Sequence, residues 1–163
     1  MVFVVAGSSR ERLADLTRIL LSSFPGSTIY QHVNPQCISN DVINNKVNGV
    51  FLETEIGSCN GIELMWQLRN RKRDVPVYIL SENEAFRITA IKAGADGYFV
   101  YPIAGETVKN VLLAGQMLKE QAVITGSLPK SGKGFGGIHH RQLPVENRFI
   151  RRFRKESSPW KRR

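Results

Sequence analysis

The chain has 163 residues, of which 42% are hydrophobic, enough for one globular domain with an extension. Its formal net charge of +9 is uneven, because residues 1–126 hold 12 basic and 12 acidic residues and residues 127–163 supply the whole excess. The start, MVFVVAG, lacks the basic segment of a secretion signal, and no apolar run approaches the ~18 residues of a membrane span. We therefore expect a cytoplasmic protein without integral membrane association.

The neutral part of the chain alternates between strand and helix patterns five times. Strands are expected where short apolar runs stand between turn formers, and helices where apolar residues recur every three or four positions after a capping residue such as Ser8 or Ser9. This alternation predicts an α/β fold with a doubly wound parallel sheet covered on both faces. The expected strands cover residues 2–5, 27–32, 49–52, 75–80 and 98–100, and the expected helices cover residues 10–24, 35–45, 62–71, 82–93 and 105–121.

The expected central strand, residues 49–52, is followed by two carboxylates, Glu53 and Glu55. A short loop over residues 56–61 then leads into the next helix. Ligands of open α/β sheets bind at the carboxyl ends of the strands. Glu53 is therefore the first candidate site residue.

This segment resembles the phosphoacceptor segment of bacterial response-regulator receiver domains. In that family an Asp ends the third strand, an apolar residue and usually Pro follow three and four positions later, and Gly follows eight positions later. Here Glu53 stands in the Asp place, Ile56 and Gly57 in the apolar and Pro places, and Gly61 in the Gly place. The resemblance implies a receiver-like domain over residues 1–122 with five strands in the flavodoxin-like order 2-1-3-4-5.

The other chemical positions of the family are matched unevenly. The resemblance implies an acidic pair after the first strand, where this chain has Ala6 and Gly7. It implies a Lys after the fifth strand, where this chain has Tyr101. Ser81 matches the hydroxyl position and Tyr98 matches the aromatic switch position. The phosphorylation groups are thus changed, whereas the two residues that report phosphorylation are kept.

We therefore expect a degenerate receiver, or pseudo-receiver, that is not an enzyme and holds no metal or other cofactor. Mg²⁺ takes oxygen ligands, and without the acidic pair only Glu53, with Glu55 or Glu82, remains to bind it. Phosphoryl transfer depends on such cationic stabilisation. Glu53 is then either a built-in mimic of the phosphorylated state or a solvated carboxylate without a signalling role. The alternative function is an atypical receiver that a histidine kinase still phosphorylates.

A regulatory protein of this kind acts in signalling or transcriptional control through protein contacts. Receiver domains commonly pair through their fourth helix, fifth strand and fifth helix, which implies a partner or homodimer surface over residues 83–121. The resemblance places Tyr98 and Tyr101 at that surface or its edge, and aromatic side chains are favoured interface anchors.

Residues 123–163 are expected to form a flexible linker followed by a basic, partly amphipathic tail. Cationic side chains bind phosphates and aromatic side chains stack on bases, so the tail is expected to bind DNA or RNA. An acidic protein groove, an anionic membrane surface, or a solubilising role without a partner are the alternatives. The residues expected to bind are Arg148, Phe149, Arg151, Arg152, Arg154, Lys155 and Trp160.

Two further motifs carry less information. Cys37 and Cys59 are too few for a disulfide framework or a zinc site, and we expect free thiols that are buried or partly buried. His139 and His140 are adjacent in a Gly-rich segment and are expected to be solvated.

Overall fold

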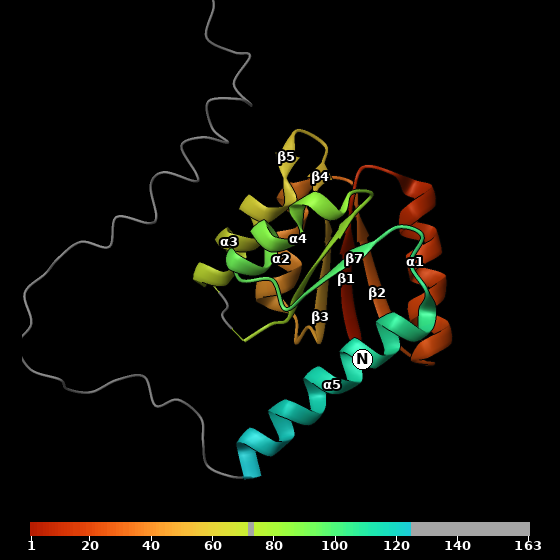
Figure 1. Ribbon diagram of the computed structural model, residues 1–163, viewed down its shortest axis with the longest axis vertical. Helices are drawn as coiled ribbons and strands as arrows, with labels where there is room; N and C mark the ends of the chain where they lie inside the picture. The colour runs from red at the N-terminus through yellow and green to blue at the C-terminus, as the bar shows by residue number, and fades with distance from the viewer. Residues whose placement is uncertain (72–73, 125–163) are drawn as a thin grey trace, which may run out of the picture. The chain divides into compact units, whose positions relative to one another are not determined.

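The computed structural model describes residues 1–71 and 74–124, which lie in the first of the two units, Met1–Thr125 and Gly126–Arg163, into which the chain divides. These residues form a five-stranded parallel sheet in the order β2-β1-β3-β6-β7 (Figure 1). The fourth and fifth strands of this sheet are β6 and β7, because β4 and β5 form a separate hairpin. The order is therefore the predicted 2-1-3-4-5. The sheet strands are β1 (Val2–Ala6), β2 (Thr28–His32), β3 (Gly49–Glu53), β6 (Val77–Ser81) and β7 (Gly97–Val100).

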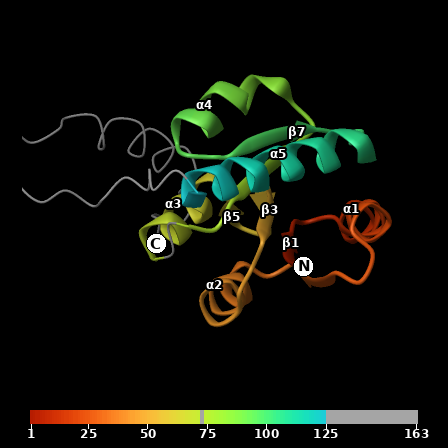
Figure 2. The same cartoon turned by 90° about the horizontal axis from the view of Figure 1, so that it is seen from below.

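Helices connect the strands and cover both faces of the sheet, with α1 on one side and α2 and α3 on the other (Figure 2). Of the two predicted capping residues, Ser8 and Ser9, it is Ser9 that caps α1, because its side chain accepts a hydrogen bond from the backbone N–H of Arg12. The helix expected over residues 82–93 is instead a 3₁₀ turn followed by a short α-helix, and Asn83 provides the cap. The helical elements are α1 (Arg10–Ser23), α2 (Pro35–Asn44), α3 (Gly61–Arg71), η1 (Glu84–Phe86), α4 (Arg87–Lys92) and α5 (Gly105–Ile124).

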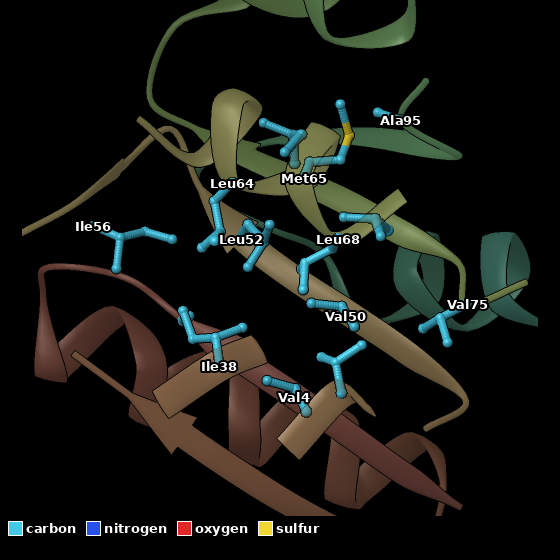
Figure 3. Close-up of a cluster of buried hydrophobic side chains, with 14 of the residues drawn as sticks. Val4, Ile38, Val50, Leu52, Ile56, Leu64, Met65, Leu68, Val75 and Ala95 are labelled. Carbon is cyan, nitrogen blue, oxygen red and sulfur yellow. The ribbon is translucent and has the colours of Figure 1, made fainter. Parts of the chain in front are cut away.

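Successive residues of the buried strands point to opposite faces and build two hydrophobic clusters. On β3, Val50 and Leu52 join α2 and α3 in the first cluster (Figure 3), whereas Phe51 joins α1 and α5 in the second. Both faces of β3 are therefore buried, as the uninterrupted apolar run predicts. This packing fixes the ends of the strands, where the candidate site lies.

The segment expected as a loop over residues 56–61 contains a small antiparallel hairpin of β4 (Glu55–Ile56) and β5 (Cys59–Asn60). Gly57 turns the hairpin with a φ of 60°. Proline is restricted to φ near −65°, so the proline usual at this position of the resembling family has no place in this turn. Ile56 anchors the hairpin because its side chain is fully buried in the first cluster.

Some side chains differ from the sequence expectations. Both Cys37 and Cys59 are free but exposed, because one lies early in α2 and the other in the hairpin. The apolar residues Ile43 of α2 and Trp66 of α3 are also exposed. Within the part of the chain that the structure describes, no helix is long and apolar enough to cross a membrane.

Candidate functional site

The candidate site lies at the carboxyl ends of β1, β3 and β6, where the sheet presents Ala6, Glu53 and Ser81 at one edge. Glu53 is the central side chain, and the residue is only 3% exposed. It accepts hydrogen bonds from the backbone N–H of Ser8 at 2.9 Å, from Arg12 Nε at 2.9 Å and from the Tyr101 hydroxyl at 3.1 Å. Glu53 is therefore not the solvated carboxylate that one of the two interpretations expected.

Two glycines make room for Glu53. A Cβ atom on Gly7 would lie 2.4 Å from Glu53 Cδ, and a Cβ atom on Gly61 would lie 1.9 Å from the backbone oxygen of Glu53. Gly61 also donates its N–H to the backbone oxygen of Thr54 at 2.9 Å. Both positions exclude a side chain at this backbone geometry. Position 61 therefore requires a Gly, because a larger side chain would collide with the backbone of Glu53.

Arg12 links two carboxylates that come from different strand ends. Its Nε contacts Glu53, and one terminal nitrogen of the same guanidinium contacts Glu82, which follows β6. The guanidinium carbon also lies 5.4 Å from the centre of the Tyr101 ring, within the range of a cation–π contact. The Glu53 side chain is 4% exposed, and the Glu82 side chain is 72% exposed. The contact to Glu53 is therefore the less screened of the two.

Tyr101 occupies the place where the resembling family has a Lys, and its phenol donates to Glu53. Burial raises the pKa of the Tyr101 phenol well above its ordinary value of 10, and the charge and hydrogen bond of Glu53 raise it further. The phenol thus stays protonated through the physiological range. It supplies a neutral hydrogen-bond donor where a Lys would supply a positive charge.

The residues at this edge do not fit a divalent metal ion. Ala6 is fully buried and Gly7 has no side chain, so neither supplies an oxygen ligand. The oxygens of Glu53 are already taken by three donors, one of which is a cation. Among residues 1–71 and 74–124, no group of three or more His, Cys, Asp or Glu side chains is arranged to hold a metal.

The two expected switch residues lie next to this site and meet at one backbone segment. Ser81 is 5% exposed, and its hydroxyl oxygen accepts from the N–H of Asn83 at 3.1 Å. Tyr98 is also 5% exposed, and its hydroxyl donates to the backbone oxygen of Asn83. Both residues therefore hold the segment between β6 and η1. Because Tyr98 is buried, it is not an exposed interface anchor, contrary to the expectation from its aromatic character.

The structure brings together the expected positions Ala6, Gly7, Glu53 and Tyr101, and adds residues that the sequence interpretation missed. Ser8 and Arg12 both donate to Glu53, and the backbone of Asn83 bonds to both Ser81 and Tyr98. Glu82, considered with Glu53 as a metal ligand, contacts Arg12 instead. Glu55, considered as a metal ligand, is exposed on β4 and touches the site only through its backbone oxygen, which accepts from the Ser8 hydroxyl. The expected binding residues of the tail, from Arg148 to Trp160, lie outside the described residues.

An exposed apolar surface lies on η1 and α4 beyond the switch segment. Phe86, Ile88 and Ile91 are 38%, 68% and 48% exposed, and we call these three residues the α4 surface. On α5, Leu113 and Met117 are also exposed. Tyr101 is only partly buried, but its hydroxyl is committed to Glu53. Over residues 83–117, where exposure is described, the large exposed apolar residues of the expected partner region are therefore Phe86, Ile88, Ile91, Leu113 and Met117.

Comparison with known proteins gives a consistent picture. A family model described as the response regulator receiver domain matches residues 12–113. The fold is similar to that of a response regulator protein from Burkholderia pseudomallei, solved with a phosphorylated aspartic acid, a calcium ion and citrate. That similarity has a TM-score of 0.61 and 22% identity, and covers 76% of this chain and 74% of that chain.

Two further structures resemble the chain in fold. A receiver domain protein from Clostridium thermocellum has a TM-score of 0.64 at 14% identity, covering 74% of this chain and 97% of its own. The receiver domain of the sensor histidine kinase PA1611 from Pseudomonas aeruginosa PAO1, with a magnesium ion in its active site cleft, has a TM-score of 0.61 at 14% identity. Those coverages are 68% and 93%. No curated protein matches the chain.

Proposed function

The chain belongs to the response regulator receiver domain family, and we propose that it is a pseudo-receiver that regulates signalling or transcription without being phosphorylated. One observation carries this proposal. The residue in the acceptor place, Glu53, is buried and accepts hydrogen bonds from Ser8, Arg12 and Tyr101. Its oxygens are engaged inside the protein instead of facing a phosphoryl donor.

Phosphoryl transfer has geometric and electrostatic requirements that this site does not meet. An acceptor oxygen must lie in line with the leaving group, and positive charges must stabilise the transferred group. At 3% exposure Glu53 has almost no accessible surface for that approach. The family's Lys is replaced by Tyr101, whose phenol stays neutral, and the acidic pair is replaced by Ala6 and Gly7. We therefore propose that the domain has no catalytic role.

The switch segment supports a regulatory role that does not need a modification. Ser81 and Tyr98 are both buried and bonded to Asn83, so the backbone before η1 is already held. In the proposed mechanism the domain stays in this one arrangement and offers the α4 surface to a protein partner or to a second copy of the chain. The proposal includes the idea that Glu53 imitates a phosphorylated residue. In that case Glu53→Gln should weaken binding of the protein partner.

Intact mass after incubation with acetyl phosphate and Mg²⁺ tests the proposed function. An ordinary receiver domain with an acceptor Asp serves as the positive control, and it should gain one phosphoryl group. The chain should gain none. A stoichiometric gain that Glu53→Gln abolishes would establish the rival function, an atypical receiver that is still phosphorylated.

The charge distribution supports a second activity, nucleic-acid binding by the basic tail. Residues 1–126 are formally neutral, so the net charge of +9 resides in residues 127–163. Lys and Arg that neutralise phosphates supply most of the affinity of non-specific nucleic-acid binding. A tail of this size would add contacts mainly to phosphate groups, while the receiver domain supplies the protein contact.

A further inference from the structure

Arg12 occupies an unusual position for a positive charge. It lies in the first turn of α1, where the helix dipole and the free N–H groups favour a negative charge. The neighbouring N–H of Ser8, just before this helix, indeed binds the carboxylate of Glu53. A cation in this turn is therefore mildly unfavourable, and contacts to anionic side chains offset that cost. Glu53 and Glu82 provide that contact.

The two carboxylates come from the ends of neighbouring parallel strands, β3 and β6, and Arg12 joins them. The remaining face of the guanidinium lies over the Tyr101 ring. The contact therefore includes two anions, a ring and one permanently charged group. The single positive charge of Arg12 balances one of the two carboxylate charges.

We propose that Arg12 is the resident cation of this site, bridging Glu53 and Glu82 as a divalent metal ion would. This inference rests on the proposed function, the loss of phosphorylation. It states that Arg12 occupies the place that a divalent metal ion takes in a phosphorylated receiver. Arg12 excludes a metal in two ways: its guanidinium fills the space between the two carboxylates, and its charge repels another cation. Removing that charge leaves two carboxylates and converts the site into one that binds a divalent cation.

Manganese binding to three forms of the full chain tests this role, because Mn²⁺ takes oxygen ligands and broadens the NMR signals of nearby residues. The wild-type chain should show no saturable binding at this site. Arg12→Gln should gain saturable binding, at Mn²⁺ concentrations at least about tenfold below those at which the wild type shows any broadening. The broadening should centre on residues 53 and 82. Arg12→Lys keeps the positive charge and should behave as the wild type.

Two controls separate this role from a merely structural one. Arg18→Gln removes another arginine of α1, one that pairs with Asp15 on the exposed side of the helix, and it should gain no site. Adding Glu53→Gln to Arg12→Gln should abolish the gained binding. If Arg12→Gln is unfolded without metal, millimolar Mn²⁺ should restore the folded state.

Three results would overturn the role assigned to Arg12. They are equal Mn²⁺ binding by wild type and Arg12→Gln, no gain at residues 53 and 82, and an Arg12→Gln chain that stays unfolded in Mn²⁺. Each is distinct from failure of the proposed function. That function fails when the wild-type chain accepts a phosphoryl group, whatever Arg12→Gln does with Mn²⁺.

Discussion

The side chain of Glu53 fills the space beside Gly7 that any larger residue at position 7 would need. A Cβ atom there would lie 2.4 Å from Glu53 Cδ, 2.5 Å from Oε2 and 2.6 Å from Cγ. The absent acidic residue at position 7 and the longer carboxylate at position 53 are thus sterically coupled. A restored Asp at position 7 would collide with the present Glu53.

This coupling gives the first prediction. Gly7→Ala should lower the free energy of unfolding by about 1–3 kcal/mol, because overpacking displaces Glu53 from its three donors. In a Glu53→Ala background the same change should cost much less, since the clashing atoms are gone. Urea unfolding of the four chains measures the coupling. Gly115→Ala is the control, because its Cβ would lie 3.7 Å from the nearest atom, the Tyr78 hydroxyl, and should be neutral or stabilising. Equal costs in both backgrounds would contradict the prediction.

The second prediction concerns the charge of Glu53. Glu53→Gln keeps the shape but replaces one acceptor oxygen by an amide nitrogen that donates. Either Ser8, which donates to Oε2, or both Arg12 and Tyr101, which donate to Oε1, then lose their acceptor. We expect a loss of about 1–3 kcal/mol in the free energy of unfolding. Glu55→Gln, on the exposed position of the hairpin, should change it by less than about 0.5 kcal/mol. Thermal unfolding of both variants decides the comparison.

The third prediction concerns alkaline pH. Burial raises the pKa of Tyr78 to about 12 from its ordinary value of 10, and the pKa of Tyr101 is also raised. The folded chain therefore holds these protons more tightly than the unfolded chain. Their stabilisation is complete below pH 10 and is lost as pH rises through the folded pKa. The melting temperature should fall above pH 10, and absorbance of phenolate should follow it.

Tyr101→Phe isolates the share of Tyr101 in this effect. The variant should lose about 1 kcal/mol at neutral pH, the net value of its hydrogen bond to Glu53, and should show a shallower decline above pH 10. Tyr30→Phe, at an exposed position of β2, should leave the decline unchanged. An identical alkaline decline in wild type and Tyr101→Phe would argue against the role of this phenol.

The fourth prediction concerns the α4 surface. Ile88→Lys and Ile91→Lys should weaken self-association or partner capture, because a charge replaces exposed apolar area at the expected contact. The melting temperature should change little, since both side chains are largely exposed. Sedimentation equilibrium and co-purification from cells measure the two outcomes. Leu21→Lys on α1 is the matched control, an exposed leucine outside this surface. If the wild-type chain is monomeric and Ile88→Lys still co-purifies with the same partners, the α4 surface is not the contact surface.

The fifth prediction concerns the basic tail. If four or five of its cationic residues bind phosphates, the logarithm of affinity should fall with the logarithm of salt concentration by roughly 0.7–0.9 per phosphate contact. Deleting residues 145–163 should abolish binding. Phe149→Ala and Trp160→Ala should weaken single-strand binding more than duplex binding, because unpaired bases offer a face for stacking. Fluorescence anisotropy at several salt concentrations measures the slope, and binding that ignores salt would favour a protein groove or a solubilising tail.

The sequence by itself determined the order and type of the main elements, because strand and helix periodicities are local properties of short windows. The apolar run of residues 49–52 predicted burial on both faces, and Ser8 or Ser9 was predicted to cap the first helix, which the structure assigns to Ser9. The positions of Ala6, Gly7, Glu53 and Tyr101 followed from the spacing of these elements together with the family resemblance. Their shared edge followed from the parallel order of the strands.

Only the tertiary structure decided what Glu53 touches. Arg12 lies 41 residues away in a charged helix start, and nothing local separates it from Arg10 or Arg18. Three other features also depend on more than local sequence. They are the direction of the Glu53 side chain, the hairpin turn at Gly57, and the hydrogen bonds of Ser81 and Tyr98 to the backbone of Asn83. Periodicity reports which face of an element is apolar. It does not report which side chain of a distant element reaches a given atom, because that depends on sheet register and on the space that Gly7 leaves open.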